Sequence, residues 1–181
     1  MEVRLPRLLD ANMNEVARLN PSALSISPSG DALSTAAMTL PPGEARARMR
    51  DWVELYTPHG SAGIYRVTRR REDAVEGQRL TLTHGLCALE DAVIPGEGTL
   101  SGSPGQVIAA ILAHQKRALW TLGRAANGPS VEVEYSYTNA LEALEDMLGK
   151  LGDYALTFDQ SSLPWKLGLT ALSEIDNPAA T

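Results

Sequence analysis

The stretch 103–172 constrains the fold most, because it carries two complete helix signatures separated and followed by extended segments. Ser103 suits an N-cap and Pro104 the first helical position, where a missing N–H costs nothing, and an apolar run follows. Asn139 begins a second signature of the same kind, with leucines at helical spacing until Gly152. We therefore predict two helices here.

The segments around these helices predict strands. Residues 119–123 and 132–137, between the helices, are expected to form a strand pair, and 154–158 with 165–170 a hairpin. The predicted helix face comprises Ile108, Ile111, Leu112, Leu141, Leu144 and Leu148, and the predicted sheet face Leu156, Phe158, Leu167 and Leu169. Trp120 and Trp165, with apolar neighbours, are expected in this core rather than in an exposed sugar-binding platform.

Three short motifs in this stretch resemble the small α/β domain of phage tail baseplate hub proteins. They are a Trp-x-x-Gly element at 120–123, an Asn-Ala-Leu-x-x-Leu helix from Asn139, and Tyr-x-Leu-x-Phe-Asp at 154–159 followed by Trp-x-Leu-x-Leu. The resemblance implies an N-terminal barrel domain ahead of this one. It also implies trimers with two barrels per full-length chain, matching a hexameric tail tube.

The region before residue 95 is predicted to be mainly antiparallel β-structure. A hairpin of 2–9 with 16–19 is expected, followed by two short strands, 23–27 and 32–40, with a turn at 28–31 between them. A three-stranded meander is expected over 52–85. The fold class is thus α+β: an antiparallel β-barrel-like domain, then a small two-helix α/β domain packed on a short sheet. The domains are predicted at 1–94 and 95–175, with 176–181 a linker or truncated end.

Arginines gather in two places. Arg46, Arg48 and Arg50 alternate in a segment that could be strand or helix, and a solvated face is favoured over an acidic-partner patch. Residues 70–77 are predicted to be a charged turn of the meander. A possible assembly interface between copies lies there, with a solvated hairpin tip as the alternative; its residues are Arg69, Arg70, Arg71, Glu72 and Asp73.

No catalytic constellation is found in the sequence, so no catalytic residue, cofactor or metal is predicted. The three histidines, His59, His84 and His114, lack metal-ligand spacing. The glycine-rich segment 95–102 lacks the Gly-Lys-Ser/Thr ending of a phosphate loop and is expected to be an interdomain loop. The remaining candidates are expected to be surface acids or a buried thiol: Glu90, Asp91, Glu142, Glu145, Asp146 and Cys87.

Composition limits the class of protein. A net charge of −6 argues against nonspecific nucleic-acid binding, and no nucleic-acid contact is expected. The lone Cys87 excludes an internal disulfide, and no apolar run reaches the length of a membrane span.

The resemblance leads to a functional hypothesis: a structural, non-enzymatic subunit of a phage or prophage tail tip that closes the tail tube and connects it to host-recognition parts. The expected partners are copies of itself, as a homotrimer in the full-length protein, and tail tube and distal tail proteins. The expected location is the virion tail tip, and the bacterial cytoplasm during assembly. Two alternatives stay open: the anchoring part of a tail-associated cell-wall hydrolase, and a small-ligand-binding β-barrel.

Overall fold

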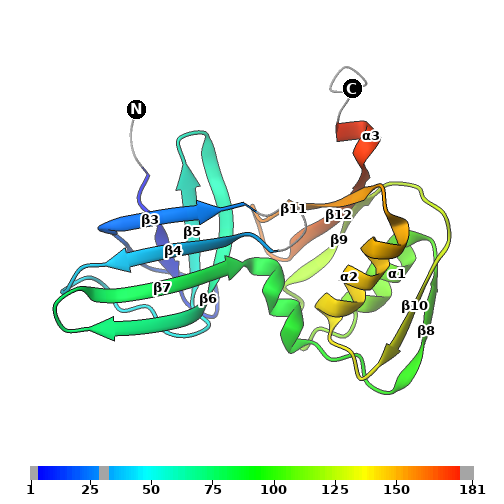
Figure 1. Ribbon diagram of the computed structural model, residues 1–181, viewed down its shortest axis with the longest axis horizontal. Coiled ribbons are helices and arrows are strands. Elements are labelled where there is room, and N and C mark those ends of the chain that lie inside the picture. Colours follow the sequence, from blue (N-terminus) through cyan, green and yellow to red (C-terminus); the bar gives the residue numbers. More distant parts are fainter. Residues whose placement is uncertain (1–3, 29–32, 176–181) are drawn as a thin grey trace. The chain divides into compact units, whose positions relative to one another are not determined.

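The computed structural model describes residues 4–28 and 33–175, and the chain divides into two compact units, Met1–Cys87 and Ala88–Thr181. The division precedes the boundary expected after residue 94. The predicted turn at 28–31 falls largely outside the described residues, as do the predicted end segment 176–181 and the start of the first strand. The structure is mixed α+β, with mostly antiparallel sheets and few helices (Figure 1).

Unit 1 is one seven-stranded sheet in which all neighbouring strands are antiparallel, in the order β2-β1-β5-β6-β7-β4-β3. This order confirms the predicted hairpin and the predicted meander, and the two further predicted strands pair with each other. Its strands are β1 (Arg7–Leu9), β2 (Glu15–Arg18), β3 (Ala23–Ser27), β4 (Thr35–Leu40), β5 (Trp52–Thr57), β6 (Gly60–Asp73) and β7 (Gly77–His84).

The sheet is curled but open. Its outermost strands, β2 and β3, are joined directly by residues 19–22, and a connection this short spans at most roughly 17 Å. The Leu19 N–H bonds to the carbonyl of Pro6 and the Ser22 N–H to that of Thr39, so the connection is tied to both ends of the sheet. No strand pairing joins β2 to β3 within the described residues, so the predicted barrel does not close.

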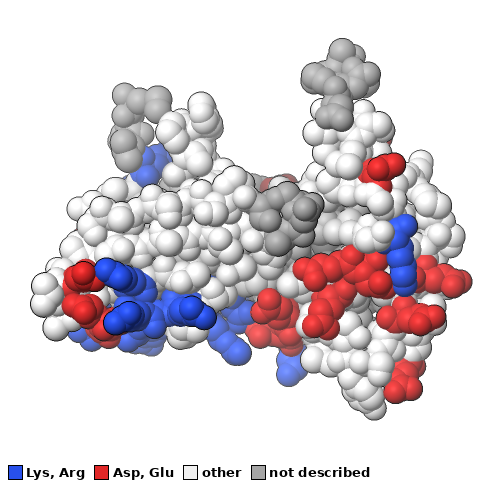
Figure 2. Space-filling model, viewed as in Figure 1, with Lys and Arg blue, Asp and Glu red and all other residues white. Residues whose placement is uncertain are grey.

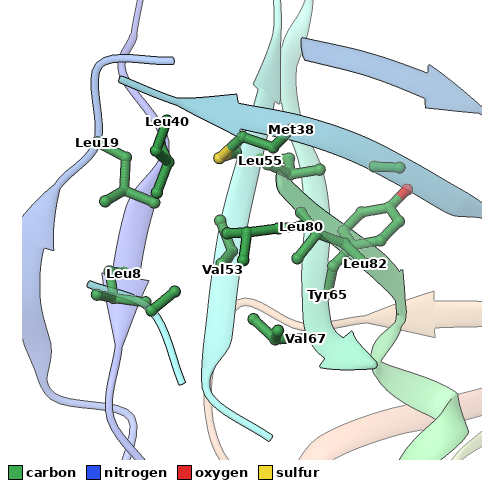
Figure 3. Packing of buried hydrophobic residues seen from close by; sticks show 12 residues of the cluster. Leu8, Leu19, Met38, Leu40, Val53, Leu55, Tyr65, Val67, Leu80 and Leu82 are labelled. Atoms are coloured by element: carbon green, nitrogen blue, oxygen red, sulfur yellow. The ribbon is translucent and has the colours of Figure 1, made fainter. Parts of the chain in front are cut away.

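One face of the curled sheet forms the core of unit 1. Alternation along the strands places apolar side chains on this face, where they pack between the strands in Figure 3. Each fully buried leucine or valine contributes about 1.5–3 kcal/mol. The cluster consists of Leu8, Leu19, Ala36, Met38, Leu40, Ala47, Val53, Leu55, Tyr65, Val67, Leu80 and Leu82.

Unit 2 contains two small sheets and two main helices. The 3-10 helix η1 (Gly85–Asp91) leads into it. Its other elements are β8 (Glu97–Gly102), α1 (Pro104–Leu112), β9 (Trp120–Ala125), β10 (Val131–Ser136), α2 (Ala140–Leu151), β11 (Tyr154–Asp159), β12 (Trp165–Ala171) and α3 (Leu172–Ile175).

The pairing in unit 2 corrects two predictions. The expected interdomain loop 95–102 contains strand β8, which pairs antiparallel with β10. The segments between the helices do not pair with each other, because β9 runs parallel to β12 in a sheet of order β11-β12-β9. The predicted hairpin of β11 and β12 is confirmed.

Helices α1 and α2 pack against each other and contact strands of both sheets. Gln106 Oε1 accepts hydrogen bonds from the backbone N–H and the hydroxyl of Ser103 at the start of α1, while Asn139 accepts from Glu142 N at the start of α2. The predicted core face is confirmed except at Leu148, which is half-buried.

The sheet face of this core differs from the prediction at Phe158, which is 44% exposed, and at Leu156, which is half-buried, whereas Leu167 and Leu169 are buried. Both tryptophans named from the sequence are buried, and the ring centroids of Trp120 and Trp165 lie 5.2 Å apart in an edge-to-face arrangement. None of the helices within the described ranges is long and apolar enough to cross a membrane.

Candidate assembly surface

The residues predicted as an assembly interface lie on a strand and not in a loop. Residues 69–73 form the end of β6 and pair with 77–81 of β7, so the turn is only 74–76. Charge made the segment resemble a turn, but the Asp73 carboxylate closes the actual turn by accepting from Val75 N and Glu76 N, at 2.8 and 3.0 Å. These hydrogen bonds hold the pKa of Asp73 below its usual range.

The register divides the arginines between two faces. Arg70 lies opposite Leu80, on the core side, and donates to the carbonyl of Ala47 at 3.4 Å and to Glu72 at 2.9 Å. Because neighbouring residues of a strand alternate, Arg69 and Arg71 lie on the outer side.

Arg71 is directly opposite Arg79, and all three outer side chains are exposed. We name Arg69, Arg71 and Arg79 the arginine face.

The acids of the hairpin pair within the chain. Glu72 contacts Arg70 and also Arg46, at 3.4 Å, and Glu76 contacts Arg79. Arg69 and Arg71 form no ion pair with any of the described residues. Figure 2 shows Lys and Arg side chains gathered over the β6–β7 hairpin, with acidic side chains beside them at its tip.

A loop rich in arginine lies against this hairpin. Residues 44–50 form neither a strand nor a helix, although the sequence favoured one of these. The loop is held by Gln78, which is 6% exposed: its Oε1 accepts from Ala47 N at 3.1 Å and its Nε2 donates to Ala47 O at 3.2 Å. Its arginines are exposed, as the solvated-face prediction requires; they are Arg46, Arg48 and Arg50.

Unit 2 carries a surface of opposite charge. Its members are exposed carboxylates at helical spacing on the solvent side of α2: Glu142, Glu145 and Asp146. We name these residues the acidic face, and Figure 2 shows acidic side chains gathered over α2.

One lysine lies at the edge of this surface, between α2 and β10. Lys150 contacts Asp146 at 2.8 Å and donates to the carbonyl of Glu132 at 2.8 Å. It lines a groove of about 340 Å³ together with Glu132 and Glu134. The remaining acids of the face, Glu142 and Glu145, have no cationic partner within 4 Å among the described residues.

The other candidates named from the sequence are not brought together. His59 is exposed and His114 half-buried, whereas His84 is buried with its ring edge-on to Tyr65 at 5.8 Å. Cys87 is buried, as predicted.

The acidic candidates Glu90 and Asp91 are exposed at the end of η1. The described part of the chain contains no group of three or more metal-ligating side chains.

Sequence analysis did not identify the acidic face as one surface or Arg79 as part of the arginine face. Counting charges separately on the two sides of Cys87 would have indicated the acidic bias of unit 2, whereas the place of Arg79 follows only from the strand register. Unit 1 has eleven arginines, no lysine and ten acids, whereas unit 2 has five basic and twelve acidic residues.

No protein-family model matches the sequence, and no curated protein matches it. Solved structures do match its fold. Prophage tail protein gp18 from Listeria monocytogenes EGD-e aligns with 93% of this chain at 13% identity and a TM-score of 0.68. The tail protein from Neisseria meningitidis MC58 aligns with 91% at 12% identity and a TM-score of 0.61. The chain spans about half of each of these proteins, 51% and 49%.

Proposed function

We propose that this chain is a structural part of a phage or prophage tail tip, acting as a hub subunit that closes the tail tube and connects it to host-recognition parts. The observation that carries the proposal is the fold match over 93% of the chain, which extends across both units, to a protein described as a prophage tail protein. A match to a second tail protein, from a different bacterium, supports the same role.

The surface features fit a role in assembly. Exposed charged side chains concentrate on the β6–β7 hairpin and on α2, whereas the described histidines and the cysteine are scattered or buried. In this proposal the residues 69–73 belong to an interface between copies, and the full-length protein is a trimer that contacts tail tube and distal tail proteins.

Location in the particle tests this function. Purified tails from the phage or induced prophage would be labelled with an antibody against this chain and viewed by negative-stain electron microscopy, with tails from a deletion strain as the control. We expect label at the tail tip, and tails that are missing or open at that end in the deletion strain. Normal tails from the deletion strain, or label along the whole tube, would contradict the hub role.

A further inference from the structure

We propose that the arginine face of one copy binds the acidic face of a second copy, so that unit 1 of each chain contacts unit 2 of the next. This inference rests on the proposed function and deepens it by naming the partner of Arg69 and Arg71. The partner is a second copy of this chain, and the contact is salt-dependent.

The arginine face is costly for an isolated chain. Arg71 lies directly opposite Arg79, and like charges in directly opposed positions destabilise a strand pair. Arg79 is compensated by Glu76 and Asp73 attracts Arg71 at longer range, but Arg69 and Arg71 have no carboxylate within 4 Å in the described part of the chain. An anionic surface from outside the chain would remove this repulsion.

The neighbouring acids of the same hairpin are poor candidates for that anionic surface. Glu72 already contacts two arginines of its own chain, Arg46 and Arg70. Asp73 is used to close its own turn. An interface in which these acids meet the arginines of the next copy would first have to break these internal contacts.

The acidic face of unit 2 offers the carboxylates that the arginine face lacks. Glu142 and Glu145 are exposed at i, i+3 on α2 and have no cationic partner within 4 Å among the described residues. Unit 2 carries a formal charge of −7 and unit 1 a charge of +1. Arginine is also the side chain best suited to such a contact, because its planar guanidinium binds carboxylates through two parallel hydrogen bonds.

The location of the two faces on different units gives the contact a direction. A contact between two different patches is heterologous, so it repeats from copy to copy and forms a ring when the rotation closes. This is the type of contact that a subunit closing the end of a tube requires. Complementary charge would also steer copies together and exclude wrong registers.

A charge-swap experiment tests the pairing. Self-association of the 181-residue chain would be measured by sedimentation velocity at low and high NaCl concentration. Arg69→Glu with Arg71→Glu reverses one face, and Glu142→Arg with Glu145→Arg reverses the other. We expect each pair to weaken self-association by about tenfold or more, and the chain carrying all four changes to regain it. Arg18→Glu and Glu174→Arg, which reverse exposed charges elsewhere, are the matched controls and should change little.

Several results would overturn the inference. A wild-type chain that stays monomeric at every salt concentration would do so. Unchanged self-association of either charge-reversed variant would also do so, as would a chain with all four substitutions that does not regain self-association. Tight binding of a short DNA duplex, lost in the Arg69→Glu, Arg71→Glu variant, would assign the arginine face to nucleic acid instead. Circular dichroism confirms folding of each variant. Antibody labelling of purified tails decides the hub role separately, so either idea can fail alone.

Discussion

Gln78 and Ala47 are joined by two hydrogen bonds, from Ala47 N to Gln78 Oε1 at 3.1 Å and from Gln78 Nε2 to Ala47 O at 3.2 Å. Both residues are buried, so this side chain supplies the partners that a β-strand would otherwise give to the loop backbone. The pair fixes residues 44–50 and their three arginines against the β6–β7 hairpin.

Gln78→Met is therefore expected to destabilise unit 1 by about 1–3 kcal/mol, because a side chain of similar size leaves the buried backbone groups of Ala47 without this partner. Urea denaturation followed by circular dichroism measures the change. The same substitution at exposed Gln106, which removes a cap interaction of α1, is the matched control and should cost about 1 kcal/mol or less. Equal losses of unfolding free energy at the two positions would show that the Gln78–Ala47 hydrogen bonds do not hold the loop.

Gly77 is expected to tolerate no side chain. Its φ is +87°, and an added Cβ would lie 2.1 Å from the carbonyl oxygen of Leu40, a backbone atom with no freedom to move aside. Gly77→Ala should cost at least about 1–3 kcal/mol from backbone strain alone. Gly149→Ala is the control in α2, where a Cβ meets nothing within 4 Å, and it should stabilise by about 0.5–1 kcal/mol. Thermal denaturation of the two variants checks the opposite signs.

Local patterns predicted most elements because their causes are local. Alternation identified β5, β6 and β7, and cap residues located the starts of α1 and α2. The glycines in 95–102 led to the prediction of a loop, whereas most of this segment forms a strand. Gly98 lies in strand β8, where a Cβ would approach the Tyr135 hydroxyl to 2.8 Å, so this glycine permits close packing rather than a loop.

Other features depend on contacts distant in sequence and could not be predicted locally. The parallel pairing of β9 with β12 joins segments separated by β10, α2 and β11. The arginine face depends on the register that sets Arg71 opposite Arg79, and a bulge between Val67 and Arg69 shifts that register. Sequence reasoning identified the charged segment as an interface candidate, but which arginines point outward follows only from this pairing.

Leu144 lies at the centre of the helix face of unit 2 and is fully buried. Leu144→Ala should cost about 2–5 kcal/mol, as expected when a large core side chain leaves a cavity. Leu172→Ala, at a position that is 41% exposed in the same unit, is the control and should cost far less. Denaturant unfolding of both variants measures the difference, and a loss below about 0.5 kcal/mol at Leu144 would show that the core assignment is wrong.

Asp73 is expected to make the stability of unit 1 depend on acid pH. The N–H groups of Glu76 and Val75 favour its carboxylate form and lower its pKa in the folded state. A group whose folded pKa is lowered stabilises the fold fully above its unfolded pKa, about 3.9 for Asp. That contribution is lost as the pH falls through the folded pKa.

Asp73→Asn tests this because an amide oxygen can still accept both hydrogen bonds but does not titrate. The stability difference between wild type and this variant, from urea midpoints, should be constant near neutral pH and shrink below about pH 4. Asp159→Asn is the parallel variant in unit 2, where hydrogen bonds from the hydroxyl and backbone N–H of Ser161 lower the pKa of Asp159. A difference that stays constant throughout the acid range would show that these turn contacts do not favour the ionised carboxylate.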